Sequence, residues 1–200
     1  MTSDRGSHPA AFHLATLLAL LRSGEQSAGM AFGRIRQGLS PGLLVVALPT
    51  LSHLIDDERR HDESLARHCD GLPYVRVGDA HTRRFFYSLE SREPSIHLAR
   101  VASLDACVCQ VLTRVLVALG EPSGEPSTVT LLSTIRADEA RHVKISRTLA
   151  RLHGLNDTSM RNVDLDVREG FATLLMTRTA AFEALHVDMS RLVAAIRRDC

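Results

Sequence analysis

Apolar residues in this 200-residue chain recur every three or four positions over nearly its whole length. That spacing places them on one face of an α-helix and does not fit the alternation of a β-strand. An aromatic content of 4% and the absence of tryptophan also disfavour a β-sandwich. We therefore expect an all-α protein, whose length suits a single domain over residues 1–200 with a sizeable core.

Glycine and proline residues divide this pattern into segments. We expect a four-helix bundle over about 9–153, with helices at about 9–37, 43–68, 95–119 and 127–153. Pro49 is expected to kink the second helix or to mark its first turn, and Ser127 or Thr128 to cap the fourth. Residues 69–94 are poorly periodic and are expected to form a long crossover. Accessory C-terminal helices, one long or two shorter with a break near His186, are expected at about 163–198.

Two segments of the bundle share the pattern D-E-x-R-H, at residues 57–61 and 138–142. In a helix, Glu at position i and His at i+3 lie on one face about one turn apart, so both can bind one metal ion. A single Glu-x-x-His is common on solvated helices. Two copies with the same flanking Asp and Arg are a much stronger indication of a metal site.

Both motifs interrupt the apolar stripe of their helix. Aliphatic residues one and two turns earlier precede both Glu58 and Glu139. An ionised carboxylate buried on such a face is costly without a partner, and a divalent cation would compensate it. The motifs are therefore expected to face the core as metal ligands.

The two partner helices offer one matching acid each. Glu25 is the only acid in residues 6–55, and Asp105 is the only acid in residues 94–120. Glu25 precedes the first motif's glutamate by 33 residues, and Asp105 precedes the second's by 34. At about 1.5 Å rise per residue, a chain that climbs one helix and descends the next returns to nearly the same height. All four carboxylates are thus expected at one level of the bundle.

The set Glu25, Glu58-x-x-His61, Asp105, Glu139-x-x-His142 resembles the ferritin-like di-iron carboxylate superfamily. The doubled D-E-x-R-H is most similar to its oxygen-activating members, such as bacterial multicomponent monooxygenase hydroxylases and acyl-carrier-protein desaturases. It is also similar to the small ferritin-like oxygenases of tRNA modification and natural-product pathways. The resemblance covers about residues 25–153, and it departs at Asp105, where many members carry Glu.

The resemblance implies a ferritin-like bundle and a role for each matching residue. Six residues would bind two iron ions, with a Mn/Fe pair as the alternative: Glu25, Glu58, His61, Asp105, Glu139 and His142. The two motif glutamates would bridge the metals or bind one each, and Glu25 and Asp105 would be terminal ligands. Four residues would support them, the aspartates as acceptors for histidine N–H groups and the arginines by pairing with those aspartates across the helices: Asp57, Asp138, Arg60 and Arg141.

Plainer interpretations remain open. The motifs could be two solvated charge clusters, or a site that keeps the fold without metal. Asp105 could be a satisfied buried polar residue, and Cys109, one turn later, more often packs as a small hydrophobe than faces a metal. Leu112 stands where radical-generating relatives carry tyrosine, so a tyrosyl radical is not expected.

The resemblance implies a non-haem di-iron oxygenase or oxidase that activates O₂ to oxidise a small organic substrate, in a natural-product or RNA-modification pathway. Two alternatives are a ferritin-like protein for iron binding or storage, and a rubrerythrin-like peroxide scavenger. The lack of a CxxC pair argues against the second of these. Gel filtration would test storage, because a mineral core needs a cage.

Partners and location follow from composition. The chain contains no motif for a redox cofactor, so an external reductase or ferredoxin is expected. The net charge of +1 without a basic run argues against a nucleic-acid partner, with tRNA second to a small molecule. Four cysteines without a disulfide framework suggest the cytoplasm. The apolar runs at 9–21 and 42–55 fit buried helix faces better than a signal peptide or membrane span. Any oligomer is expected to be a homodimer.

Overall fold

The computed structural model describes residues 9–39, 41–70, 72–73, 80–120 and 126–198, which form eight α-helices and no strand. The prediction of an all-α protein is confirmed. Four helices are long: α1 (Pro9–Gly38), α2 (Pro41–Cys69), α4 (Pro94–Leu119) and α5 (Pro126–Leu152). The others are α3 (Ala80–Ser88), α6 (Asp157–Met176), α7 (Thr179–Ala184) and α8 (Met189–Arg198).

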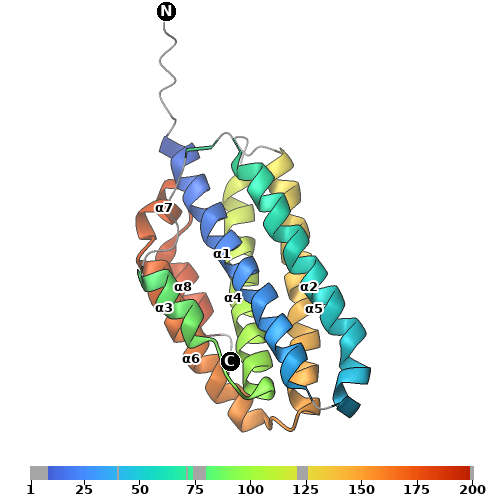
Figure 1. Cartoon of the computed structure of the whole chain (residues 1–200). Helices are drawn as coiled ribbons and strands as arrows, with labels where there is room; N and C mark the ends of the chain where they lie inside the picture. The colour runs from blue at the N-terminus through green and yellow to red at the C-terminus, as the bar shows by residue number, and fades with distance from the viewer. Residues whose placement is uncertain (1–8, 40, 71, 74–79, 121–125, 199–200) are drawn as a thin grey trace, which may run out of the picture.

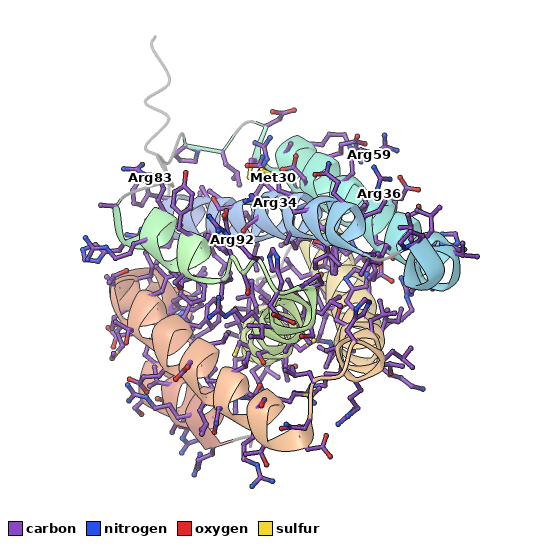
Figure 2. The ribbon with its side chains drawn as sticks, turned by 60° about the horizontal axis from the view of Figure 1, so that its bottom comes forward. Met30, Arg34, Arg36, Arg59, Arg83 and Arg92 are labelled. Atoms are coloured by element: carbon purple, nitrogen blue, oxygen red, sulfur yellow. The ribbon has the colours of Figure 1, made fainter. Side chains whose placement is uncertain are left out.

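The four long helices lie side by side as two antiparallel pairs, α1 with α2 and α4 with α5 (Figure 1). The pairs meet where α1 contacts α4 and α2 contacts α5. Because α2 and α4 run in the same direction, the connection between them returns along the length of the molecule (Figure 1). The second view places α4 between α1 and α6 (Figure 2), and α6 contacts both α4 and α8.

The long helices begin and end within two residues of their predicted limits. Each begins with a proline, whose ring presets a helical φ and whose missing N–H is not needed in the first turn. These residues are Pro9, Pro41, Pro94 and Pro126. The prolines thus fix the helix starts that position the candidate site.

The expected cap of the fourth helix was wrong. Ser127 and Thr128 lie inside the first turn of α5 and do not cap it. Thr128 is buried instead, with its Oγ1 2.7 Å from His68 Nε2 in a hydrogen bond to α2. Pro49 lies inside α2 beyond its first turn, which excludes the first-turn alternative, and the kink stays a prediction.

The segment predicted as a long crossover contains α3; its residues 71 and 74–79 lie outside the described residues. The helix is nine residues long, which is too short for the apolar period to stand out. Phe85 buries its ring against Phe171 of α6, with centroids 5.6 Å apart. Tertiary contact, absent from any sequence window, therefore stabilises α3.

The C-terminal region also differs from the expectation of one or two helices from about residue 163. It begins at Asp157 and contains three helices. Asn156 caps α6, since its side chain accepts a hydrogen bond from the Ser159 N–H at 2.8 Å. The break expected near His186 is present between α7 and α8, where His186 has a φ of 60°. A second break follows Met176.

Apolar side chains form two buried clusters with a polar layer between them. On α1, Leu21 belongs to one cluster and Ala28 to the other, with Glu25 between them. Leu54 and Leu65 bracket the glutamate of α2 in the same way. The core is therefore interrupted at one level, by acids and histidines.

By length and composition α4 is the one described helix that could cross a membrane, with a mean hydropathy of 1.7 in an 18-residue window. Half of that window is buried in the molecule, against helices on several sides. The central helix of a soluble bundle has the same character. The described cysteines, Cys69, Cys107 and Cys109, are free thiols, and Cys200 lies outside the described residues.

Candidate metal centre

The polar layer consists of the side chains predicted from the sequence to bind metal. All are at most 5% exposed, and each of the four long helices contributes: Glu25 from α1, Glu58 and His61 from α2, Asp105 from α4, and Glu139 and His142 from α5. The structure therefore brings the six residues together. Whether they bind metal stays a prediction.

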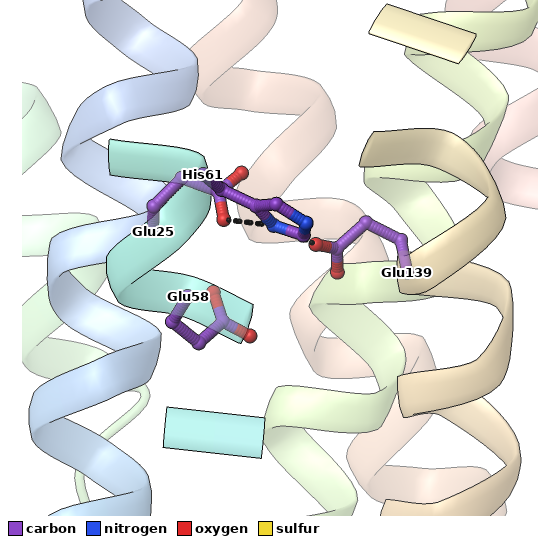
Figure 3. Close-up of side chains that lie close together, drawn as sticks. All are labelled: Glu25, Glu58, His61 and Glu139. Atoms are coloured by element: carbon purple, nitrogen blue, oxygen red, sulfur yellow. Dashed lines mark hydrogen bonds and ion pairs between the residues drawn. The ribbon is translucent and has the colours of Figure 1, made fainter. Parts of the chain in front are cut away.

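One group of potential ligands consists of Glu25, Glu58, His61 and Glu139, which offer atoms within 4.8 Å of one another. His61 Nδ1 lies 3.0 Å from Glu25 Oε2 and 3.5 Å from Glu139 Oε1 (Figure 3). We call this group position one. Its residues come from α1, α2 and α5, and the carboxylates of α1 and α5 lie close to His61 Nδ1.

A second group, position two, consists of Asp105, Glu139 and His142, whose ligand atoms also lie within 4.8 Å of one another. His142 Nδ1 lies 3.7 Å from Glu139 Oε2 and 3.1 Å from Glu58 Oε1. Glu139 therefore turns one oxygen to each position, and Glu58 also reaches both. The centroids of the two imidazole rings are 6.0 Å apart. Such an arrangement suits two metal ions bridged by carboxylates.

Four buried atoms of this layer make no hydrogen bond of good geometry among the described residues, although the first and the last lie 3.1 Å apart: Glu58 Oε1, Asp105 Oδ2, Glu139 Oε1 and His142 Nδ1. Leaving a buried polar atom unpaired costs about 1–3 kcal/mol. Adjacent ligands about 2.1 Å from one ion would lie about 3.0 Å apart, close to the shortest separations found here. These atoms therefore fit two divalent cations better than they fit one another.

The motif aspartates orient the histidines, and they do so across the bundle. Asp138 Oδ2 of α5 lies 3.0 Å from Nε2 of His61 on α2, and Asp57 Oδ2 of α2 lies 3.1 Å from Nε2 of His142 on α5. Each carboxylate accepts from the outer ring nitrogen, which leaves Nδ1 facing the centre. A carboxylate in this place fixes the tautomer and raises the basicity of a histidine ligand.

The two arginines of the motifs hold the aspartates in place. Arg141 donates to Asp57 Oδ2 at 2.6 Å and lies 2.9 Å from Asp138 Oδ1. Arg60 donates to Asp57 Oδ1 at 2.7 Å and to Asp138 Oδ2 at 3.4 Å. The expected pairing across helices is thus present, and each arginine also contacts the aspartate of its own helix. Each arginine therefore contacts both aspartates, and the arginine side chains are partly exposed to solvent.

Burial dominates the acid–base properties of the carboxylates. It raises the pKa of Glu58 and of Asp105 well above the usual range, and the neighbouring charge of Glu139 raises both further. Burial likewise raises the pKa of Glu25. Burial acts in the same sense on Glu139, but its close contacts with His142 and His61 outweigh burial and lower its pKa.

For the histidines, burial alone would lower the pKa, because their charged form is protonated. Burial disfavours their charge, yet contacts with Glu139 and the other acids outweigh it, raising the pKa of His61 to about 11 and of His142 to about 9. Hydrogen bonds from His142 and the arginines outweigh burial at Asp57 and lower its pKa to about 2. In the metal-free chain, protons on the histidines and carboxyl groups therefore reduce the repulsion between the buried acids. A metal cation must displace these protons to bind.

Two neighbours of the layer, Cys109 and Leu112, lie on α4. Cys109 directs its Sγ toward the carbonyl oxygen of Arg136, 3.7 Å away. Burial raises the pKa of Cys109 to about 12, which keeps it a thiol. Leu112 is fully buried in the core.

A narrow cavity adjoins the layer, and the sequence did not reveal it. Its volume is about 30 Å³, and it is lined by the four carboxylates and by apolar side chains of α1, α3, α4 and α6. Phe86 of α3 and Phe171 of α6 contribute rings to its wall. Both come from segments whose packing against the bundle could not be predicted from periodicity.

No protein-family model, curated protein or solved structure matches the chain. Fold and site together define it as an all-helical protein with a buried cluster of glutamate and histidine residues that can hold metal.

Proposed function

We propose that this chain is a non-haem di-iron oxygenase or oxidase of the ferritin-like superfamily, which activates O₂ to oxidise a small organic substrate. The observation that carries the proposal is the buried layer of four carboxylates and two histidines, with each histidine hydrogen-bonded to the aspartate of the opposite motif. Solvated charge clusters would lie on the surface, and a simple buried ion pair would not leave its acids unpartnered.

The connectivity of the long helices supports the ferritin-like assignment. Two antiparallel helix pairs are joined by one long connection, so that α2 and α4 are parallel (Figure 1). Ferritin-like folds have four long helices with one such crossover, and place carboxylates and Glu-x-x-His pairs in the bundle core.

The ligand set favours iron, with a Mn/Fe pair as the alternative. Carboxylate oxygens and one imidazole per position suit these metals, whereas the thiolates preferred by softer metals lie outside the set. Bound iron would supply the electron transfer to O₂ that no amino-acid side chain provides. The chain would fix the positions of the metals, orient the histidines through Asp57 and Asp138, and exclude bulk water.

The cavity beside the carboxylates favours oxidation of a substrate over storage. Its wall is apolar apart from the acids, as a dry pocket for O₂ requires. Electrons would come from an external ferredoxin or reductase in the cytoplasm. A small molecule is the preferred substrate and a tRNA the second, in a natural-product or RNA-modification pathway.

Oxygen uptake tests this function. The chain loaded anaerobically with Fe(II) is mixed with O₂, and uptake is compared with a Glu58→Ala, Glu139→Ala double variant treated identically. We expect rapid uptake, in proportion to bound iron, by the native chain only. Equal uptake by both proteins would contradict the proposal, because free Fe(II) would then account for it.

A further inference from the structure

A groove on the surface lies between α1 and α3 and is far larger than the cavity beside the acids. Its volume is about 290 Å³. Its lining includes two arginines, the exposed side chains of a methionine and a tyrosine, and a phenylalanine: Arg34, Arg83, Met30, Tyr87 and Phe86. Figure 2 shows Arg34, Arg83 and Met30 on the side formed by α1 and α3. The groove thus combines cationic groups with apolar surface.

Basic side chains outnumber acidic ones among the described residues that line this groove. Among the described residues that line it, Glu90 is the only acid, against two arginines. The acid of α1, Glu25, is buried in the metal layer and adds nothing to the surface. Arg36 and Arg92 lie on the same side without lining the groove (Figure 2). Arg59 lies there too, but it is paired with Asp56 and Glu63.

Arg34 already binds a carboxylate. Its Nη1 lies 2.6 Å from Glu90 Oε2, and both side chains are more than a third exposed. An exposed pair of this kind contributes little stability, so a carboxylate from a ligand can take the place of Glu90. The pair shows that the groove can accommodate a carboxylate at this guanidinium.

Phe86 links the groove to the interior. Its side chain lines the groove, the cavity beside the acids, and a void of about 10 Å³ between them. Arg34 and Glu90 line both groove and void, whereas Ala28 and Leu104 line both void and inner cavity. The groove, the void and the inner cavity therefore share lining residues, in that order, from the surface to the carboxylates.

The ring of Phe86 also stands against the helix that carries Glu25. A Cβ placed on Gly24 would lie 3.9 Å from Phe86 Cζ, so the ring tip reaches α1 next to the metal layer. A rotation of this ring about its side-chain bonds would join the spaces that it now separates. Aromatic side chains change rotamer without any backbone rearrangement.

We propose that the groove between α1 and α3 is the substrate-binding site, and that Phe86 gates its connection to the metal centre. The ligand is an amphipathic anion: Arg34 and Arg83 bind its carboxylate or phosphate head, and its apolar body passes Phe86 toward the acids. This inference rests on the proposed oxidation at the metal layer and specifies the substrate class.

Binding of octanoate, acetate and octanol to the full metal-free chain, measured by isothermal titration calorimetry, tests the proposal. Octanoate should bind more tightly than octanol, which lacks the charge, and than acetate, which lacks the apolar body. Arg34→Ala and Arg83→Ala should each weaken octanoate binding about tenfold, while Arg36→Ala, also exposed on α1, should leave it unchanged. Glu90→Gln should tighten it by removing a competing carboxylate.

The gate is tested by the ratio of the octanoate and acetate affinities. Phe86→Trp should reduce this ratio by filling the passage, and Phe86→Leu should preserve it. Thermal unfolding of each variant checks that the chain is folded. Octanol binding as tight as octanoate binding, or equal losses in the Arg36 and Arg83 variants, would overturn the site.

A protein partner would give a different result. If octanoate does not bind but an acidic ferredoxin binds the native chain and not Arg83→Ala, the surface serves an acidic protein and our proposal is wrong. Iron binding by the same preparations separates the two proposals. Normal iron loading without octanoate binding overturns the groove alone, whereas octanoate binding without iron loading overturns the metal centre.

Discussion

The two halves of the bundle carry the same five-residue pattern but build unlike metal positions. In position one, His61 Nδ1 is hydrogen-bonded to Glu25 Oε2. In position two, neither His142 Nδ1 nor Asp105 Oδ2 has a hydrogen-bond partner among the described residues. The terminal acids also differ: position one has Glu25, and position two has Asp105, whose side chain is one methylene shorter.

The motifs and the partner helices contribute different parts of each position. Both motifs give the same crosswise support of histidine by aspartate, at 3.0 and 3.1 Å. The helices α1 and α4 then supply different acids, a glutamate to position one and an aspartate to position two. We expect the two metals to bind with unequal affinity, position one being filled first.

Removing the residue that the two positions share should have the largest effect. Glu139 turns an oxygen toward each histidine, so Glu139→Ala should abolish binding at both positions. Metal content after Fe(II) loading and desalting, measured by atomic emission, reports the loss. Glu63→Ala, which removes an exposed acid of α2, is the control and should keep full loading. Retention of one metal by Glu139→Ala would show that the positions are independent.

Changes to the terminal acids should affect one position each. Glu25→Ala and Asp105→Ala should each reduce the metal content from two ions to one. Asp105→Glu should bring the second affinity closer to the first, because the longer side chain restores reach. Stepwise titration with Fe(II) or Mn(II) measures both affinities. Identical binding steps in the native chain would contradict the inequality.

Substitution of the motif aspartates tests the crosswise arrangement. Asp57→Asn should weaken metal binding at the position of His142, and Asp138→Asn at that of His61, each by about 10- to 100-fold. The spectrum of a bound Co(II) ion distinguishes the positions. If each substitution instead affected the histidine of its own motif, the hydrogen bonds across the bundle would not control the ligands.

The response to pH should differ between metal-free and metal-loaded protein. The folded pKa values of His142 and His61, about 9 and about 11, exceed their ordinary value of 6.5. Their contribution to stability is therefore complete below pH 6.5 and is lost as the pH rises through those values. The buried Glu58 and Asp105, whose pKa values are also raised, act in the same direction.

Urea unfolding at a series of pH values measures this trend. The metal-free chain should lose stability as the pH rises above 6.5. Bound metal should stabilise it more at higher pH, since ligands must release protons to bind. A metal-free chain whose stability is constant over this range would show that the buried acids and histidines are not protonated together.

The arginines should have the smallest effects, because they are more than half exposed. Arg60→Ala and Arg141→Ala should each cost less than about 1 kcal/mol in the free energy of unfolding. Arg141 makes the shorter contacts across the helices, 2.6 Å against 3.4 Å for Arg60, so its loss should cost more. Thermal denaturation of both variants compares them, and a larger loss for Arg60→Ala would reverse this ranking.

The sequence was informative where one physical rule dominates. Periodicity and prolines predicted the four long helices, and the spacing of Glu25 and Asp105 from the motifs predicted a single level for the acids. The structure places those six side chains together.

The sequence was uninformative where contacts between distant segments decide the outcome. Helix α3 depends on the packing of Phe85 against Phe171, 86 residues later in the chain, and the cavity depends on Phe86. The difference between the two positions also escaped prediction. The Asp105 departure was visible, but its effect depends on how the side chains of four helices meet in the core.

Anaerobic titration of the full chain with Fe(II), monitored by Mössbauer spectroscopy, tests the central claim most directly. The account predicts close to two irons per chain with unequal affinities, magnetically coupled after oxidation, and a clear loss in the Glu58→Ala, Glu139→Ala double variant. No bound iron, or equal binding by the native chain and the double variant, would contradict it.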